Sequence, residues 1–276
     1  MDDPFVSPAQ PWTWHGDWAG RVAASAVHAG HDVRPDLAVL MSLDEATRLR
    51  EEDPFTDEIA AGIASRVTIN RSRFEVDLNR DRAGAVYRTP ADCWDLEVWD
   101  TGELRSDLVE ESALLHDAFY AELAEHLDRL AAHGPFVFFD VHSYNHRRDG
   151  ADGPEAPSEE NPEVNVGTGS LDRERFGLLV DTFMGALGSI ETSTGRLDVR
   201  ENVRFKGAHV ARWIHERYPG QGCVLALEFK KTYMDEWTGE PDHERITELA
   251  NALAATVPAI EAALKLSRWA TRRPRT

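Results

Sequence analysis

The stretch FVFFDVHSYNHR, residues 136–147, places four apolar side chains directly before Asp140 and His142. A short apolar run of this kind is typical of a strand that is buried on both faces of a sheet. Polar residues at the end of such a strand either mark the point where the chain reaches water or contribute to a site. The stretch therefore predicts a buried strand and makes Asp140 and His142 candidate functional residues.

Strand-like and helix-like segments alternate on both sides of this stretch. Short apolar or alternating runs predict further strands at residues 21–31, 73–80, 196–201 and 223–231. Apolar residues at helical spacing predict helices at residues 56–66, 106–133, 172–187, 208–218 and 246–264, the first with Thr56 as its N-cap. This order indicates a single α/β domain over residues 1–276, with a mixed, largely parallel central sheet flanked by helices.

Three segments fall outside this alternation. Residues 1–20 are rich in Pro and Trp and are expected to form an arm, and residues 267–276 form a basic tail. Residues 147–169 are rich in Gly, Pro and acidic side chains, which predicts a long surface loop. A loop of this length in a compact domain often forms the wall or lid of an active site.

The composition excludes several classes of function. The formal net charge is −19 and the isoelectric point is about 4.9, a balance that repels nucleic acid phosphates and anionic membrane surfaces. Two cysteines are too few for a disulfide framework or a cysteine-based zinc site. Because the sequence has neither a signal-peptide pattern nor an apolar run of membrane-spanning length, we expect a cytoplasmic protein that acts on a small molecule.

Four predicted strand ends carry polar residues of the kinds that build active sites. A single polar residue at such a position is commonplace, but four strand ends together favour one shared site. In open α/β sheets, ligands bind beyond the carboxyl ends of the strands, so these residues are expected to converge. They are His28, Asn79 with Arg80, Asp140 with His142, and Glu228.

The two histidines are candidate metal ligands. The neutral imidazoles of His28 and His142, completed by one carboxylate, would form a three-ligand zinc site with a position open to water. Asp140 lies two residues before His142, so both side chains project to the same side of the strand. Asp140 is therefore expected to accept the other imidazole N–H and to fix the orientation of His142.

The residues themselves leave the third ligand open. Asp57 follows Thr56, although an acidic residue is also favoured at a helix N-terminus for electrostatic reasons. The other candidates lie closer in sequence to His28 or in the segment REED, and are His31, Asp32, Glu51, Glu52 and Asp53. A site with these donors fits one Zn²⁺ ion or another divalent metal.

Positive charge near the strand ends predicts an anion site. Arg80 beside Asn79 suits a bidentate clamp on a substrate carboxylate, with an ion pair to Asp77 or Asp81 as the alternative. Lys206, in the segment RFKG, is a candidate for additional positive charge at this site.

Two residues at the end of the strand at 223–231 are candidates for catalysis. Glu228 follows an uninterrupted apolar run, and burial raises the pKa of a carboxyl group, which suits a general base acting on a metal-activated water. The alternative for Glu228 is an ion pair with Lys230 or Lys231. Tyr233 is a candidate hydrogen-bond donor to a developing oxyanion.

Seven short segments occur in an order that resembles the N-formylglutamate amidohydrolase (N-formylglutamate deformylase) family. They are VHAGH, EEDPFTD, VDLNR, DVHSY, VNVGTG, RFKGAHVAR and LEFKKTYMDE, and they span most of the chain. VDLNR and DVHSY also resemble motifs of the zinc carboxypeptidases, which are distant relatives of that family. The resemblance implies a phosphorylase/hydrolase-like three-layer α/β fold.

The resemblance also implies roles for the residues singled out above. His28 and His142 would bind zinc, and the TD of EEDPFTD implies Asp57 as the third ligand. Asn79 and Arg80 would bind the carboxylate of the substrate. By the same resemblance, the general base would be Glu228.

The sequence departs from the pattern of these relatives in three places. Carboxypeptidases and aspartoacylase-like enzymes have a glutamate three residues after the first histidine, where this chain has His31. This moves the acidic ligand into EEDPFTD or produces a histidine-rich metal site. HAGH replaces the family's usual HSG, and KGA replaces its KGG, so the departures concern the substrate more than the chemistry.

Together these features predict a zinc-dependent amidohydrolase that cleaves an N-acyl amino acid such as N-formylglutamate. One alternative is a carboxypeptidase or deacylase that acts on a short peptide or another N-acyl amino acid, with residues 147–169 selecting the substrate. A second alternative is a binding protein that has kept the pocket and lost turnover. The presence of Glu228 argues against this second alternative.

Overall fold

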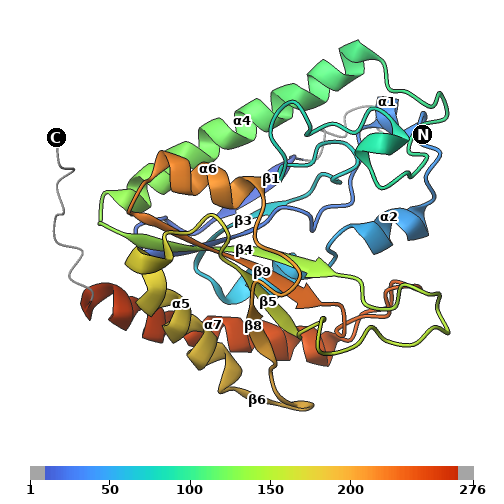
Figure 1. The fold of residues 1–276 in the computed structure, drawn as a ribbon. Helices are drawn as coiled ribbons and strands as arrows, with labels where there is room; N and C mark the ends of the chain where they lie inside the picture. Colours follow the sequence, from blue (N-terminus) through green and yellow to red (C-terminus); the bar gives the residue numbers. More distant parts are fainter. Residues whose placement is uncertain (1–9, 267–276) are drawn as a thin grey trace, which may run out of the picture.

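A computed structural model describes residues 10–266 and places a seven-stranded sheet between two layers of helices (Figure 1). The strand order is β1-β3-β2-β4-β9-β5-β8, and neighbours are parallel except for the pairs β1–β3 and β5–β9. The predicted mixed, largely parallel sheet is confirmed. The strands are β1 (Trp12–His15), β2 (Val22–Ala26), β3 (Ser65–Ile69), β4 (Phe136–Tyr144), β5 (Val164–Gly167), β8 (Val199–Glu201) and β9 (Gly222–Lys230), and the separate hairpin pairs β6 (Glu191–Thr192) with β7 (Gly195–Arg196).

Strand β4, which contains the predicted buried run, lies at the centre of the sheet. All nine of its residues are buried, and it pairs with β9 along its whole length. Phe136 and Phe138 pack into the core on one face, whereas Val137, Phe139 and Val141 pack into the core on the other. Because successive strand side chains point to opposite faces, a strand that is apolar throughout requires a helix layer on each side.

Four long helices supply these two layers (Figure 1). Helices α4 (Ser106–Ala131) and α6 (His209–Arg217) pack on the face of Phe136 and Phe138. Helices α5 (Arg173–Gly188) and α7 (His243–Leu266) pack on the opposite face. By length and composition alone, α7 is apolar enough to cross a membrane, but its apolar side chains form part of the core against the sheet.

The short elements between β2 and β3 differ from the sequence prediction. Thr56 is the first residue of α3 and not its N-cap, because Phe55 precedes it in the left-handed region with φ of 65°. The Thr56 hydroxyl instead donates to the backbone oxygen of Asp53 at 2.6 Å. The short helices between β2 and β3 are α1 (Pro35–Ala38), α2 (Glu45–Glu51), α3 (Thr56–Ile59) and η1 (Ala60–Gly62), and η2 (Pro90–Asp92) follows β3.

The prediction of a strand at RFEVDLNR is wrong, because this segment forms turns. Phe74, Val76 and Leu78 are buried as the alternating pattern required. However, Glu75 and Asp77 between them are buried as well. The alternating pattern therefore does not separate a core face from a solvent face. The buried carboxylates of Glu75 and Asp77 are instead paired with specific hydrogen-bond donors.

The loop and the arm are also shorter than predicted. The last part of the segment 147–169 forms β5, a buried strand between β9 and β8. The predicted arm contains β1, which pairs antiparallel with β3 at the edge of the sheet. The predicted strand at 196–201 is divided between β7 and β8. The basic tail at 267–276 lies outside the described residues.

Candidate metal centre and active site

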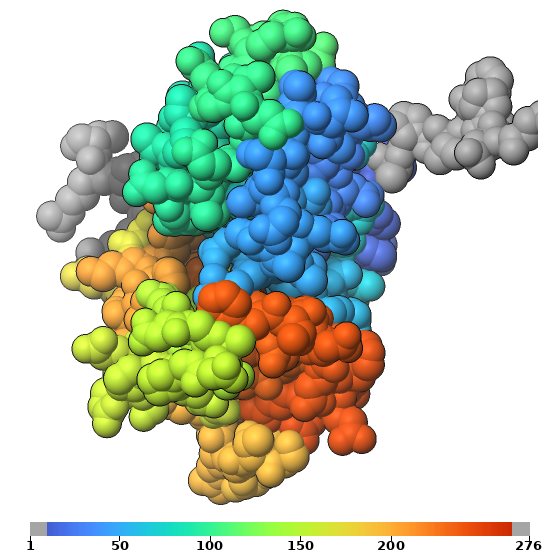
Figure 2. All heavy atoms as spheres, turned by 90° about the vertical axis from the view of Figure 1, so that its right-hand side faces the viewer, coloured from blue at the N-terminus to red at the C-terminus, as the bar shows by residue number. Residues whose placement is uncertain are grey.

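A cavity of about 850 Å³ opens at the carboxyl ends of β2, β4 and β9. Figure 2 shows the face of the molecule toward which these strand ends point, where segments far apart in sequence, drawn in blue, green, lime and orange-red, meet. Polar and charged side chains dominate the lining, and include His28, Arg50, Glu51, Asp53, Arg73, Asp77, Asn79, Arg80, Asp81, His142, Asn145, Arg148, Arg212, Glu228 and Lys231.

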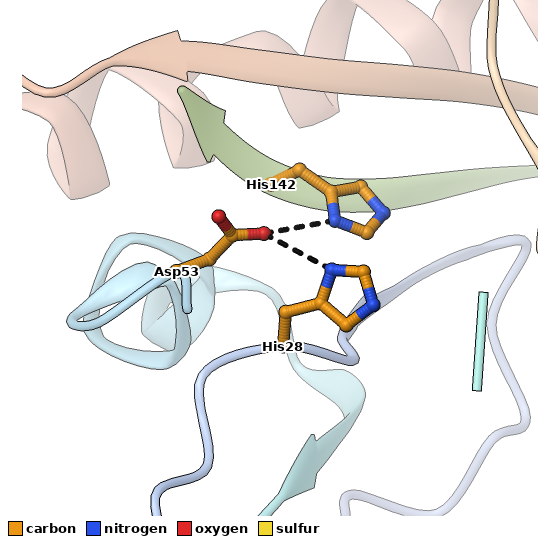
Figure 3. A group of neighbouring side chains, drawn as sticks. All are labelled: His28, Asp53 and His142. Atoms are coloured by element: carbon orange, nitrogen blue, oxygen red, sulfur yellow. Dashed lines mark hydrogen bonds and ion pairs between the residues drawn. The ribbon is translucent and has the colours of Figure 1, made fainter. Parts of the chain in front are cut away.

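Within the cavity, His28, Asp53 and His142 bring two imidazole nitrogens and a carboxylate oxygen within 4.8 Å of one another. Asp53 Oδ2 lies 3.3 Å from His28 Nδ1 and 3.1 Å from His142 Nδ1 (Figure 3). His28 follows β2, His142 lies on β4, and Asp53 lies between α2 and α3. All three side chains are buried. The fold therefore brings the two predicted histidines together around one carboxylate.

The other nitrogen of each imidazole faces a second carboxylate. His28 Nε2 lies 2.7 Å from Asp77 Oδ1, and His142 Nε2 lies 3.1 Å from Asp140 Oδ2. Both rings therefore direct Nδ1 to Asp53 and Nε2 away from it. Histidine metal ligands commonly have this arrangement, because an outer carboxylate fixes the tautomer and the orientation of the ring. The expected contact between Asp140 and His142 is present.

The site concentrates negative charge in the protein interior. Burial alone would raise the pKa of Asp53, but hydrogen bonds from His142 and His28 hold it well below its usual range. For Asp77, burial is likewise outweighed by the positive charge of Arg73, which keeps the pKa of Asp77 well below normal. Buried charges are stable only when they are paired. A divalent cation beside Asp53 would balance this excess of carboxylates, so the donor set fits a metal.

Asp53 lies between the two imidazoles, whereas the resemblance implied Asp57 as the third ligand. Asp57 lies in the first turn of α3 and is not part of the cluster. The chain turns between the two acids at Pro54 and at Phe55, whose backbone is left-handed. Among the other candidates, His31 and Glu52 pair with each other at 2.5 Å and Asp32 is exposed.

Asn79 and Arg80 line the cavity, as expected. Asn79 Nδ2 lies 3.1 Å from His142 Nε2, and Asn79 Oδ1 accepts the backbone N–H of Val210 at 3.0 Å, at the start of α6. The Arg80 guanidinium stacks 4.6 Å from the centre of the Tyr87 ring and lies 3.7 Å from Asp77 Oδ2. Its side chain is 34% exposed, so it can still contact a ligand in the cavity.

Glu228 lies on β9 directly beside His142 in the strand register. Burial raises the pKa of Glu228 to about 8, and the nearby His142 acts in the opposite direction. The alternative prediction of an ion pair with a neighbouring lysine is not supported. Lys231 Nζ donates to two backbone carbonyls and Lys230 Nζ lies 4.0 Å from Glu155. Within residues 10–266, Glu228 forms no ion pair and faces the cavity.

Two of the predicted site residues, Lys206 and Tyr233, lie away from the lining of the cavity. Lys206 is exposed and does not line the cavity. Tyr233 is fully buried behind the site, and its hydroxyl donates to the backbone oxygen of Pro54 at 3.0 Å. This hydrogen bond directs the hydroxyl of Tyr233 to the protein backbone.

The structure adds residues to the site that the sequence did not single out. Asp77 holds His28, although the sequence offered it only as a partner for Arg80. Arg73 donates to Asp77 Oδ2 at 2.7 Å and lines the cavity. Arg148 and Arg212 also line it, and neither forms an ion pair within the described part of the chain. In the sequence, Asp77 stood out only as the Asp of the segment VDLNR, and Arg212 only as the last residue of the segment RFKGAHVAR.

Comparisons with solved structures identify the fold. The structure of N-formylglutamate amidohydrolase from Ralstonia eutropha JMP134 matches with a TM-score of 0.64 and 17% identity, over 94% of this chain and 98% of that one. A gene product of Agrobacterium tumefaciens matches with a TM-score of 0.66 and 16% identity, over 92% and 96%. A metallo-carboxypeptidase from Burkholderia cenocepacia is more distant, with a TM-score of 0.37 and 16% identity over 89% and 57%.

The family comparison covers most of the chain. No curated protein matches the sequence at a significant level. However, the family model described as N-formylglutamate amidohydrolase matches residues 21–234, which include every residue of the His28–Asp53–His142 cluster together with Glu228. The chain therefore belongs to the N-formylglutamate amidohydrolase family, a family of hydrolases that act on amide bonds.

Proposed function

We propose that this protein is a zinc-dependent amidohydrolase that removes the acyl group, most simply a formyl group, from an N-acyl amino acid such as N-formylglutamate. The observation that carries the proposal is the buried His28–Asp53–His142 cluster beside Glu228 in one cavity. Two imidazoles and one carboxylate are the ligands of a catalytic zinc site that keeps one position open. Asp53 replaces Asp57 in the proposed ligand set because Asp53 lies between the two rings.

A divalent ion held by these three residues would supply Lewis-acid polarisation of the amide carbonyl and would lower the pKa of water. Other residues of the chain fix the orientation of the three proposed ligand side chains. Asp77 and Asp140 orient the two imidazoles, and Ser143 Oγ donates to Asp53 Oδ1 at 3.0 Å. The carboxylate of Asp53 is thus fixed at both oxygens.

Glu228 is the proposed general base. It takes a proton from the attacking water as the C–O bond forms, and returns this proton to the amide nitrogen as the C–N bond breaks. The products are a carboxylic acid, which is formic acid for a formyl substrate and ionises to formate, and the free amino acid. With a pKa near 8 before any cation binds, Glu228 would shift toward the ionised form beside a divalent ion, which suits proton transfer near neutral pH.

The charge of the cavity supports an anionic substrate. The protein as a whole carries a net charge of −19, yet six cationic side chains line this one cavity against five carboxylates, which lie mainly around the proposed metal site. Arg80 is the proposed clamp for a carboxylate, with Asn79 beside it. Arg148 and Arg212 bring further guanidinium groups that are not committed to ion pairs within residues 10–266. Guanidinium groups bind carboxylates through paired hydrogen bonds, which favours an amino acid substrate.

The size of the cavity supports a second candidate activity, which is deacylation of a larger N-acyl amino acid or removal of a residue from a short peptide. About 850 Å³ is in the range of sites for drug-sized ligands and exceeds the needs of a formylated amino acid. Asn145 and Arg148, at the start of the loop that ends at β5, form part of the wall. In this second candidate activity, the loop would select the substrate.

A metal titration coupled to a substrate screen tests the proposal. The purified protein is stripped with a chelator, titrated with Zn²⁺, and assayed on N-formyl, N-acetyl and dipeptide substrates that share the glutamate moiety. We expect one zinc ion per chain and the highest kcat/KM on one N-acyl amino acid. A full zinc complement without turnover of any of these amides would favour a binding protein, and the absence of zinc binding would overturn the proposed mechanism.

A further inference from the structure

The segment that follows β9 holds the backbone of the segment that carries Asp53. Lys231 Nζ donates to the carbonyl oxygens of Arg50 at 2.6 Å and of Glu52 at 2.7 Å. The Tyr233 hydroxyl donates to the carbonyl oxygen of Pro54 at 3.0 Å. Two alternate residues of one segment therefore bind three alternate carbonyls of another, and Asp53 lies between the second and the third of them.

Lys231 is an unusual residue for a buried position. It is only 1% exposed, and burying an ammonium group is costly unless it is fully paired. Its two carbonyl partners lie at the C-terminal end of α2, where carbonyl groups lack helical partners and a positive charge is favoured. Arg50 belongs to the helix and Glu52 is its C-cap. Lys231 thus fixes the point where the chain leaves α2 toward Asp53.

Tyr233 extends the same restraint past Asp53. It is fully buried, and Pro54, whose carbonyl it holds, precedes the left-handed residue Phe55 at the turn into α3. The segment between α2 and α3 contains little regular structure of its own. The Asp53 N–H donates to the carbonyl oxygen of His28 at 2.9 Å, and the contacts of Lys231 and Tyr233 fix the chain immediately before and after Asp53.

We infer that Lys231 and Tyr233 are positioning residues that hold the Asp53 carboxylate in the geometry needed to bind the metal. This inference rests on the proposed metal site, but neither residue is a proposed ligand and neither is assigned to the reaction itself. Lys231 directly follows β9, so the segment that leaves the strand of the proposed base Glu228 also positions the proposed acidic ligand. Metal ligands typically lose about 10- to 100-fold in affinity when the groups that orient them are removed.

Zinc affinity measured by competition with a chromogenic chelator tests this inference independently of turnover. Lys231→Met removes two of the three carbonyl contacts, and Lys230→Met is its matched control, because the adjacent buried lysine contacts neither carbonyl and does not line the cavity. We expect Lys231→Met to weaken zinc binding by about 10- to 100-fold and Lys230→Met to leave it unchanged.

A second pair of variants keeps the test decisive if Lys231→Met does not fold. Tyr233→Phe removes only the hydroxyl, and Tyr218→Phe is the control, because it removes a partly buried hydroxyl that donates to Asp128 Oδ1 at 2.7 Å on the far side of the sheet. We expect weaker zinc binding for Tyr233→Phe alone. If every folded variant of Lys231 and Tyr233 binds zinc as tightly as its control, the inference is overturned while the metal site stands. If the wild-type protein binds no zinc, both fail.

Discussion

His142 and Glu228 are register partners on the neighbouring parallel strands β4 and β9. Paired residues on adjacent strands project to the same side of a sheet, so the proposed metal ligand and the proposed base enter the cavity together. Their separation is set by the backbone hydrogen bonds of two central strands and not by a mobile loop. Catalytic groups on such rigid elements are held more precisely than groups on loops.

The proposed role of Glu228 predicts a loss of turnover without a loss of metal. Glu228→Gln keeps the size of the side chain and removes its ability to accept a proton. We expect kcat for amide hydrolysis to fall by about 10²- to 10⁴-fold, with one zinc ion still bound. Steady-state kinetics and elemental analysis of the same preparation provide the measurement. Unchanged turnover would assign the base to another residue.

The ligand assignment of His142 predicts loss of the metal. His142→Ala removes one of two imidazoles, and we expect stoichiometric zinc binding and activity to be lost together. His146→Ala is the matched control, because His146 is also buried and follows the same strand but is not part of the cluster. Retention of one zinc ion per chain in His142→Ala would mean that the metal binds elsewhere.

The third ligand is distinguished by a pair of conservative substitutions. Asp53→Asn removes the charge between the two imidazoles, and we expect zinc affinity to fall by at least about 10-fold. Asp57→Asn should leave affinity unchanged, because Asp57 lies outside the cluster. Chelator competition measures both. The reverse pattern would restore Asp57 as the ligand and would require α3 to move when metal binds.

The carboxylate clamp predicts a substrate-dependent defect. Arg80→Ala should raise KM for N-formylglutamate by about 10-fold or more, because a hydrogen bond to a charged group is worth roughly 1.5–3 kcal/mol. The α-carboxamide analogue of the same substrate should be affected much less. Lys206→Ala serves as the control, because Lys206 is exposed and does not line the cavity. Equal defects on both substrates would exclude a carboxylate contact.

The stability of the protein is expected to depend on pH through Glu236, whose carboxylate binds the backbone just after β4. Burial alone would raise the pKa of Glu236, but hydrogen bonds from the side chain and backbone of His146 and from the backbone of Arg147 lower it from 4.5 to about 2. A carboxyl group with a lowered folded pKa stabilises the protein above its unfolded pKa, and this contribution disappears as the pH falls toward the folded value.

Urea unfolding of the wild type and of Glu236→Gln at a series of pH values checks this expectation. Near neutral pH the variant should be less stable by about 2 kcal/mol. The difference should shrink as the pH is lowered from 4.5 toward 2, the interval between the two pKa values. A difference that stays constant with pH would show that the Glu236 carboxylate does not gain stability from its charge.

Local sequence patterns predicted the central strands and the long helices of this protein. The apolar run of β4, the matching run of β9 and the amphipathic repeats of α4 and α7 were visible in short windows, because burial on one or both faces imposes a period on the sequence. The same runs placed His28, His142 and Glu228 at strand ends, where parallel strands gather their functional groups. Their convergence in one cavity follows from the parallel order of the sheet.

Contacts between distant segments decided the rest. Asp53 and Asp57 are both aspartates and lie only four residues apart. The turn at Phe55 separates them, so that Asp53 and not Asp57 faces the two imidazoles. The carbonyl of Glu52, next to Asp53, is held by Lys231, which lies 179 residues away in the sequence. Asp77 looked like part of an alternating strand, yet it is buried because His28 and Arg73 pair with it. A short stretch of sequence indicates which residues are buried. It does not indicate which distant residues they contact, because those contacts form only in the tertiary structure.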